Sequence, residues 1–361
     1  MRGGLKIARL FGIDVFVHWT FSLLIAFIIF RGVRAEYSAQ ELVWSVLFIL
    51  LLFFIVVLHE LGHSLTARRF GIPTRNITLL PIGGVASLEK MPEKPKEELL
   101  VALAGPLVNV VLAIVLYFFI SIPSEEILVD KMSEPINPGN IVLYLFIVNI
   151  ILAVFNMIPA FPMDGGRVLR AMLSIKIKRH KATVIAARIG QVLAVFFIIG
   201  GFYGNPFLIL IGLFIIFGAQ AEAQHTKTNY MLKGATLSDV LMQNYETLQS
   251  SDSIKVAIQK LLDGQSKNFL VLDENNYPVG TLDRESMIKS ISENGVEIDV
   301  ASCMNADLLK FRASTEVESA YREMQTNNIS LALIYENEEF IGIVDSENIL
   351  EYIMLQSALD K

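Results

Sequence analysis

Six apolar runs, most of them close to 20 residues long, dominate residues 1–226 and limit what this part of the chain can fold into. A helix needs about 20 consecutive apolar residues to cross a bilayer. Lipid cannot hydrogen-bond an open backbone, so such runs favour helices. The expected spans are residues 14–31, 43–67, 97–120, 140–160, 182–201 and 206–222. The sequence therefore predicts a polytopic α-helical membrane protein with six transmembrane helices.

Composition separates this membrane part from a second part of ordinary soluble character. The chain is 53% hydrophobic and only 18% charged, whereas soluble domains are about 25% charged. The apolar density ends near residue 226, and residues 227–234 form a linker to a soluble region. No dense basic cluster indicates nucleic acid as a partner. The expected partners of residues 1–226 are the lipid bilayer and molecules within it.

The basic residues of the short loops give the expected orientation in the membrane. Positive charge in such loops favours the cytoplasmic side. Only Arg31, Arg34 and Lys131 fall on one side of the predicted topology. The other side carries Arg2, Lys6, Arg9, Arg68, Arg69, Arg75, Lys90, Lys94, Lys96, Arg167, Arg170, Lys176, Lys178, Arg179 and Lys181. We expect a multi-pass protein of the cell membrane with both termini and the soluble region in the cytoplasm.

A His-Glu-x-x-His pattern, from His59 to His63, lies inside the second apolar run. On a helix the two histidines are one turn apart and share a face. They can therefore hold one zinc ion, while Glu60 can take a proton from water that the metal activates and pass it to a leaving amine. Ionisable residues within a membrane cost several kcal/mol unless they are paired, which favours a functional site over a chance match.

A third zinc ligand is expected after the fourth run, where Pro159 and Pro162 interrupt the helix before Asp164. The Asp164 carboxylate comes from an irregular stretch at about the depth expected for His59, and it would leave the fourth zinc position open. The alternative is a helix N-cap for a helix at 167–175. Asn156 is a candidate to orient the substrate carbonyl or to stabilise the oxyanion.

Residues 76–88 are too short for a spanning helix and contain a proline and a glycine pair. They predict a β-hairpin that re-enters the membrane, with its turn at Gly83-Gly84. Such backbone survives at membrane depth only where protein buries it or where it lines a cavity. We expect a strand edge that pairs with an extended substrate beside the zinc. An interfacial loop packed on the helices is the alternative.

Together these motifs resemble the site-2 protease family of intramembrane zinc metalloproteases. The resemblance rests on residues 59–63, 81–84, 104–109 and 156–165, in this order, and covers residues 1 to about 222. It implies one zinc per chain, held by His59, His63 and Asp164, with Glu60 as catalytic base. It also implies hydrolysis of a peptide bond within or beside the transmembrane helix of a single-span membrane protein, in regulated intramembrane proteolysis.

The soluble region contains two copies of one unit, residues 235–292 and 299–356. Each copy has a helix-period stretch, a β-rich run, a polar turn and a Gly-apolar strand, the last of these at 279–282 and 341–344. The repeat resembles a tandem of CBS domains. That resemblance implies one α/β module, which in this family often binds adenine nucleotides.

The position expected to contact a nucleotide departs from the CBS pattern. Asp283 and Ser286 follow the strand in the first copy, and Asp345 and Asn348 follow it in the second. Neither copy supplies the expected hydroxyl, and both place acid where a phosphate would approach, which repels it. The sequence therefore predicts the fold but disfavours adenine nucleotide binding. Dimerisation into a homodimer or substrate docking are the remaining roles.

The leading hypothesis is thus a zinc-dependent intramembrane endopeptidase. A catalytically silent protein that binds membrane proteins with the same fold is the alternative from another class. The presence of Glu60 together with all three proposed ligands favours the enzyme. A metal transporter ranks last, because the outer parts of the spans contain few polar residues.

Overall fold

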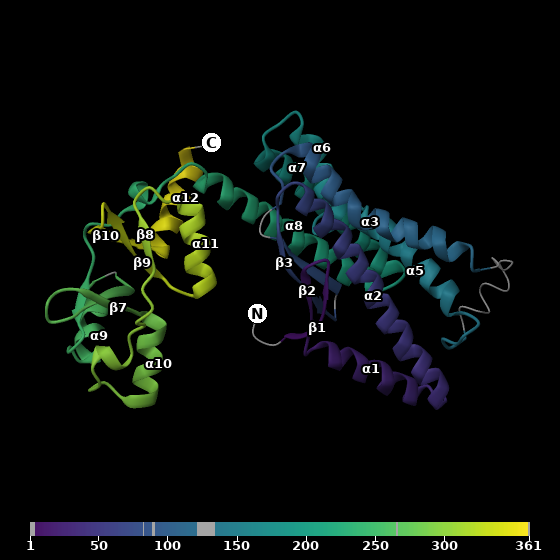
Figure 1. Cartoon of the computed structure of the whole chain (residues 1–361), viewed down its shortest axis with the longest axis horizontal. Coiled ribbons are helices and arrows are strands. Elements are labelled where there is room, and N and C mark those ends of the chain that lie inside the picture. Colours follow the sequence, from purple (N-terminus) through teal and green to yellow (C-terminus); the bar gives the residue numbers. More distant parts are fainter. Residues whose placement is uncertain (1–3, 82, 89–90, 121–133, 265, 360–361) are drawn as a thin grey trace. The chain divides into compact units, whose positions relative to one another are not determined.

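The computed structural model describes residues 4–81, 83–88, 91–120, 134–264 and 266–359. The chain divides into two compact units, Met1–Gln224 and His225–Lys361. The first combines long apolar helices with a small sheet, and the second is an α/β unit (Figure 1). Each unit has its own buried core.

The longest helix of the first unit is α2 (Ala39–Arg69), with 31 residues. Its start is fixed by a capping box in which the Ser38 hydroxyl and the Glu41 carboxylate each accept a hydrogen bond from the other's backbone N–H. Its last turn carries Arg68 and Arg69, which suit the negative end of the helix dipole. Helix α2 packs against α3 (Pro95–Tyr117).

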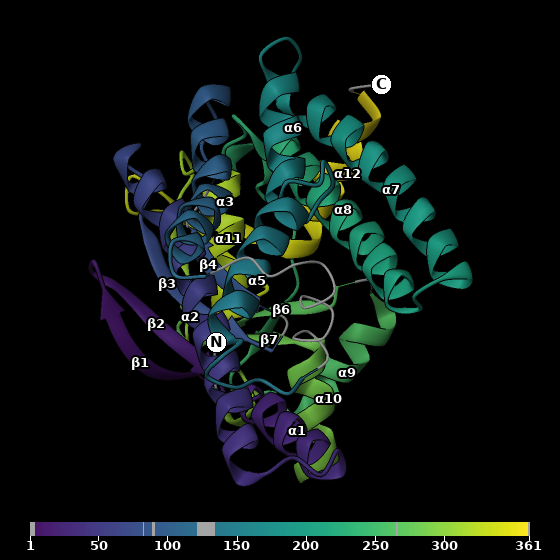
Figure 2. The same cartoon turned by 90° about the vertical axis from the view of Figure 1, so that its right-hand side faces the viewer.

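The other helices of this unit follow as a bundle (Figure 2). Helix α3 also packs against α5 (Ile141–Asn156) and α6 (Asp164–Ser174), and α6 packs against α7 (Arg179–Tyr203). Helix α8 (Phe207–Leu232) runs past the predicted end at residue 222. Among the described residues, α2, α3, α7 and α8 are long and apolar enough to cross a membrane, and α5 is apolar but has only 16 residues. These helices identify the chain as a multi-pass membrane protein.

The predicted first span, residues 14–31, is wrong over its first part. Residues Ile13–His18 form strand β2, and the helix that follows, α1 (Phe21–Arg34), has only 14 residues. The reason is that the burial of successive side chains alternates: Ile13 and Val15 are each 1% exposed, while Asp14 between them is half-buried. A period of two favours a strand, and β2 finds a parallel partner in β3.

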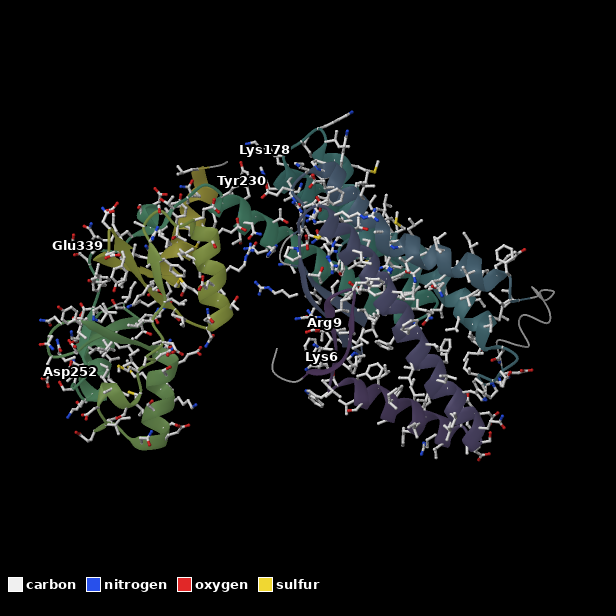
Figure 3. All side chains as sticks on the ribbon, viewed as in Figure 1. Lys6, Arg9, Lys178, Tyr230, Asp252 and Glu339 are labelled. Atoms are coloured by element: carbon white, nitrogen blue, oxygen red, sulfur yellow. The ribbon has the colours of Figure 1, made fainter. Side chains whose placement is uncertain are left out.

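Four strands form the sheet of the first unit, in the order β1-β2-β3-β4. Strand β1 (Gly4–Leu10) pairs with β2, and Lys6 and Arg9, labelled in Figure 3, both form ion pairs with Asp14. Strands β3 (Thr74–Leu80) and β4 (Gly83–Leu88) form the expected antiparallel hairpin. Its turn precedes Gly83, because Leu80 pairs with Gly83. The prediction of a turn at Gly83-Gly84 is wrong, since these glycines begin a strand that lies against α2.

The second unit repeats one order of elements twice, which confirms the predicted internal repeat. Each copy consists of a short 3-10 turn, a strand, a helix, two strands and a helix. The first copy comprises η1 (Leu237–Val240), β5 (Thr247–Gln249), α9 (Ile254–Asp263), β6 (Asn268–Leu272), β7 (Pro278–Asp283) and α10 (Arg284–Asn294). The second comprises η2 (Val300–Ser302), β8 (Lys310–Arg312), α11 (Val317–Asn327), β9 (Leu331–Glu336), β10 (Glu339–Asp345) and α12 (Ser346–Leu359).

Two three-stranded sheets, β5-β6-β7 and β10-β9-β8, form the centre of this unit. Apolar side chains of both copies meet in one cluster, which includes the fully buried Leu270 of the first and Leu333 of the second. Neither copy could bury this face alone, so the tandem forms one module.

Candidate metal centre

Three donor atoms meet on the buried side of α2. His59 and His63 lie one turn apart on α2, and their Nε2 atoms are 3.1 Å from each other. Oδ2 of Asp164, from the first turn of α6, lies 3.2 Å from Nε2 of His59 and 3.1 Å from Nε2 of His63. All three side chains are buried. We call this arrangement the ligand triangle.

The other ring nitrogen of each histidine fixes the direction of the imidazole. Nδ1 of His59 lies 2.5 Å from Oδ1 of Asn109. Nδ1 of His63 lies 2.7 Å from the backbone oxygen of Val101. Both partners are on α3, and the carbonyl oxygen of Val101 can only accept, so Nδ1 of His63 donates. Nε2 of His63 therefore carries the lone pair that points into the triangle.

The Asn109 amide assigns the same tautomer to His59. Its Nδ2 donates to Oδ1 of Asn149 on α5 at 3.1 Å, and Nδ2 of Asn149 donates to the backbone oxygen of Leu145 at 2.8 Å. Asn109 thus turns its oxygen to His59 and can only accept there. Asn109 itself was not predicted as a partner, although a polar residue within an apolar helix was a usable signal.

The donor set fits zinc. Two imidazole lone pairs and a carboxylate oxygen converge on one point, and only a cation makes that arrangement favourable. Donors at about 2.0–2.1 Å from a tetrahedral zinc lie about 3.3 Å from one another, close to the 3.1–3.2 Å seen here. Two histidines and one carboxylate leave a fourth position open, as catalytic zinc sites do. His59, His63 and Asp164 are the residues that would hold the ion.

Space for the ion depends on Gly105 of α3. A Cβ atom at this position would lie 2.2 Å from Nε2 of His63 and 2.7 Å from Nε2 of His59. It would therefore occupy the region where the lone pairs meet. The glycine lets α3 approach the triangle while the donors stay clear of carbon atoms. Gly62 likewise lets α2 approach α3 closely, because a Cβ at this position would lie 2.7 Å from the backbone oxygen of Ala104.

Asp164 reaches the triangle because of the irregular segment before it. Helix α5 ends at Asn156, and α6 begins at Asp164, so the predicted start near 167 is wrong. The N-cap residue is Met163, which excludes the alternative that Asp164 is the cap. Gly166 lets α6 start close to the interrupted segment, since its Cβ would lie 2.6 Å from the backbone nitrogen of Phe161.

The remaining predicted site residues lie around the triangle at different distances. Glu60 follows His59 on α2 and is half-buried. Gly84 of β4 crosses directly over it, because a Cβ on Gly84 would lie 3.0 Å from Cγ of Glu60. Gly83 begins the same strand. The side chain of Asn156 donates to the backbone oxygen of Leu152, 3.0 Å away on its own helix.

Arg167 is a further charged residue here that sequence reasoning did not single out. It lies one turn after Asp164 on α6, and its Nη1 is 3.8 Å from Oδ1 of Asp164. That oxygen is the one not used in the triangle. The arrangement partly neutralises the carboxylate on its outer side.

Comparison with known proteins places the chain in a family. Residues 47–197 match Peptidase family M50, and residues 237–293 and 297–355 each match the CBS domain. A zinc metalloprotease of Methanocaldococcus jannaschii is 33% identical over 97% of this chain and 96% of its own length. The chain belongs to peptidase family M50. It is a zinc metalloprotease of the site-2 protease type with two CBS domains, and its cofactor is zinc.

Two further proteins are similar to this chain. A putative zinc metalloprotease of Synechocystis is 26% identical over 99% of this chain and 97% of its own length. The solved Site-2 Protease from Methanocaldococcus jannaschii is 39% identical, with a TM-score of 0.45, over 61% of this chain and 95% of that chain. The M50 match includes His59 and Asp164.

Proposed function

We propose that this membrane metalloprotease is an intramembrane endopeptidase that cleaves a transmembrane or membrane-proximal segment of a single-span membrane protein. The position of the ligand triangle on α2 carries the proposal. His59 lies nine residues before Arg68 on one apolar helix, about 13 Å along its axis. With a hydrocarbon core of about 30 Å, the site lies below the basic end but short of the midplane. A peptide bond reaches it only from within or beside the bilayer.

The proposed ligands are His59, His63 and Asp164. Zinc, when bound, supplies a Lewis acid that polarises a carbonyl and activates water near neutral pH. Glu60, on the same turn of α2, takes the proton from the attacking water and delivers it to the leaving amine. Asn156 remains our candidate for contact with the substrate carbonyl, provided that its side chain leaves Leu152.

The hairpin is proposed to re-enter the membrane and to hold the substrate. Strand β4 ends the sheet, and its outer edge pairs with no other described strand. Gly84 brings this strand against Glu60. A substrate segment that unwinds from its helix can add to this edge through backbone hydrogen bonds. It would then lie extended beside the proposed catalytic base.

We propose the predicted orientation and domain boundaries: residues 1–226 form the six-span protease part, 227–234 the linker, and 235–292 and 299–356 the CBS repeats. The first of the proposed spans is α1 and not residues 14–31. Both termini and the CBS module lie in the cytoplasm. The module supports regulated intramembrane proteolysis through homodimerisation or substrate docking. An apolar face of α12 supports a homodimer, because Leu350, Met354 and Leu355 are exposed there.

Nucleotide binding by the module remains disfavoured. Asp283 accepts a hydrogen bond from the backbone N–H of Ser286 at 2.7 Å and so caps α10. Asp345 accepts from Nδ2 of Asn268 and from the backbone N–H of Glu347, each at 2.8 Å. Both carboxylates thus occupy backbone donors at helix starts that could otherwise receive a phosphate.

The test compares the full chain, reconstituted in vesicles with a single-span test substrate, with its Glu60→Gln variant. We expect cleavage by the wild type, none by the variant, and one zinc in each. Zinc without cleavage of any of a panel of single-span substrates would favour the catalytically silent alternative. Absence of zinc from the wild type would refute the ligand set.

A further inference from the structure

A second group of charged side chains is buried in the first unit, apart from the ligand triangle. Arg170 on α6 is 1% exposed and Glu98 on α3 is fully buried. Nε of Arg170 donates to Oε1 of Glu98 at 2.7 Å, and its Nη2 lies 2.5 Å from the same oxygen. Arg179 of α7 also reaches this oxygen at 3.1 Å, and Arg170 pairs with Glu222 of α8. The group therefore connects α3, α6, α7 and α8.

A group of this kind is weak evidence for stability. Taking charges out of water costs several kcal/mol for each ion. Proteins in which apolar side chains of the same volume replace such ions are often as stable or more stable. The four residues carry two positive and two negative charges, so loss of one partner leaves an uncompensated charge. The pairing instead fixes geometry, because the planar guanidinium fork sets the position of one helix against another.

Arg170 and Glu98 lie on the helices that carry or orient donors of the ligand triangle. Arg170 lies six residues after Asp164 on α6, a helix of only 11 residues. Glu98 lies three residues before Val101 on α3, and the Val101 carbonyl orients His63. In Figure 2, α6 runs between α3 and α7. The Arg170–Glu98 pair thus ties the helix that carries one donor to the turn of α3 that orients another.

We propose that Arg170, held by Glu98, is a positioning residue for the metal centre. The pair fixes the translation and rotation of α6 along α3, so that Oδ2 of Asp164 stays within reach of both imidazoles. Metal sites tolerate deviations of only about 0.2 Å, and a helix shifts by 1.5 Å for each residue of sliding. A short helix without this anchor would misplace its first turn. The inference rests on the proposed ligand role of Asp164, but not on the substrate.

The experiment measures the zinc affinity of the full chain in detergent by competition with a chelator, next to its thermal stability. Arg170→Gln removes the fork and is expected to weaken zinc about 10- to 100-fold, as loss of a support behind a ligand does. Glu98→Met together with Arg170→Met leaves Arg179 and Glu222 to balance each other. This double variant folds without an uncompensated charge, and we expect it to bind zinc as weakly as Arg170→Gln.

A control separates positioning from general stability. Ser38→Ala removes the N-cap hydroxyl at the far end of α2, which costs about 0.5–2 kcal/mol in such caps, and should leave zinc affinity unchanged. The proposal is overturned if the double variant binds zinc like the wild type. It is also overturned if Ser38→Ala weakens zinc as much as Arg170→Gln does. Asp164→Ala completes the set: wild-type affinity in that variant would refute the proposed ligand role itself.

Discussion

Alanine in place of Gly105 tests the ligand triangle from a residue that donates nothing to a metal. The added Cβ would lie 2.2 Å from Nε2 of His63, where ordinary contact begins at 3.4 Å. The imidazole must therefore retreat by 3.4 Å less 2.2 Å, about 1.2 Å, several times the deviation of about 0.2 Å that metal sites tolerate. We expect zinc to bind at least about 100-fold more weakly, about 2.7 kcal/mol, since even the supports behind a ligand are worth up to that much.

The fold itself should survive this change. Alanine is a better helix former than glycine by about 0.8–1 kcal/mol, so α3 gains propensity while the metal site is lost. Gly212→Ala is the matched control, because its Cβ would meet Cγ1 of Ile198 at 2.6 Å and the backbone oxygen of Ala194 at 2.7 Å. It crowds α8 against α7 without touching the triangle. For both variants, zinc content is measured by mass spectrometry and zinc affinity by competition with a chelator. Wild-type zinc affinity in Gly105→Ala would refute the placement of the site.

Three further predictions address the surroundings of the triangle and the second unit. Asn109→Ala removes the partner of Nδ1 of His59 and should weaken zinc about 10- to 100-fold in the same competition assay. Gly84→Ala would place a Cβ 2.8 Å from Cγ1 of Val56 and 3.0 Å from Cγ of Glu60, which displaces β4. We expect kcat/KM to fall about 10- to 100-fold with zinc content unchanged, and unchanged kcat/KM would argue against β4 as the substrate edge. Burial raises the pKa of the Asp345 carboxyl above its ordinary 3.8, and the hydrogen bond from Asn268 offsets part of this. The folded state therefore holds that proton to higher pH than the unfolded state, and the stabilisation is lost as pH rises above 3.8. The measurement is hydrogen exchange of β10 and α12 as a function of pH. The wild type should lose protection over that range relative to Asp345→Asn, and parallel protection curves for the two proteins would contradict the prediction.

The parts of the site that sequence could predict are those that local spacing determines. His59 and His63 share a helix face because they are four residues apart, which needs no knowledge of the rest of the fold. Asp164 could be predicted because two prolines and two glycines mark an irregular stretch at the end of an apolar run. These residues meet in the structure as expected.

The parts that could not be predicted depend on contacts between distant segments. The Val101 carbonyl is a backbone atom and leaves no trace in sequence, yet it orients His63. Arg170 was counted as one of many basic residues near a membrane surface, and only the packing of α6 on α3 shows that it is buried against Glu98. The N-terminal strand was hidden for a similar reason, since an apolar run of this length reads as a helix until its partner β3 is known.

The order of the donors along the chain has a consequence for biosynthesis. His59 precedes Asp164 by 105 residues, and His63 precedes it by 101. A ribosome adds about 5–20 residues each second, so Asp164 is made about 5–20 s after His59. During that interval α2 and α3 can enter the bilayer with both imidazoles oriented but without the carboxylate. Completion of the donor set waits for α6, and an unfinished chain therefore carries no assembled protease centre into the membrane.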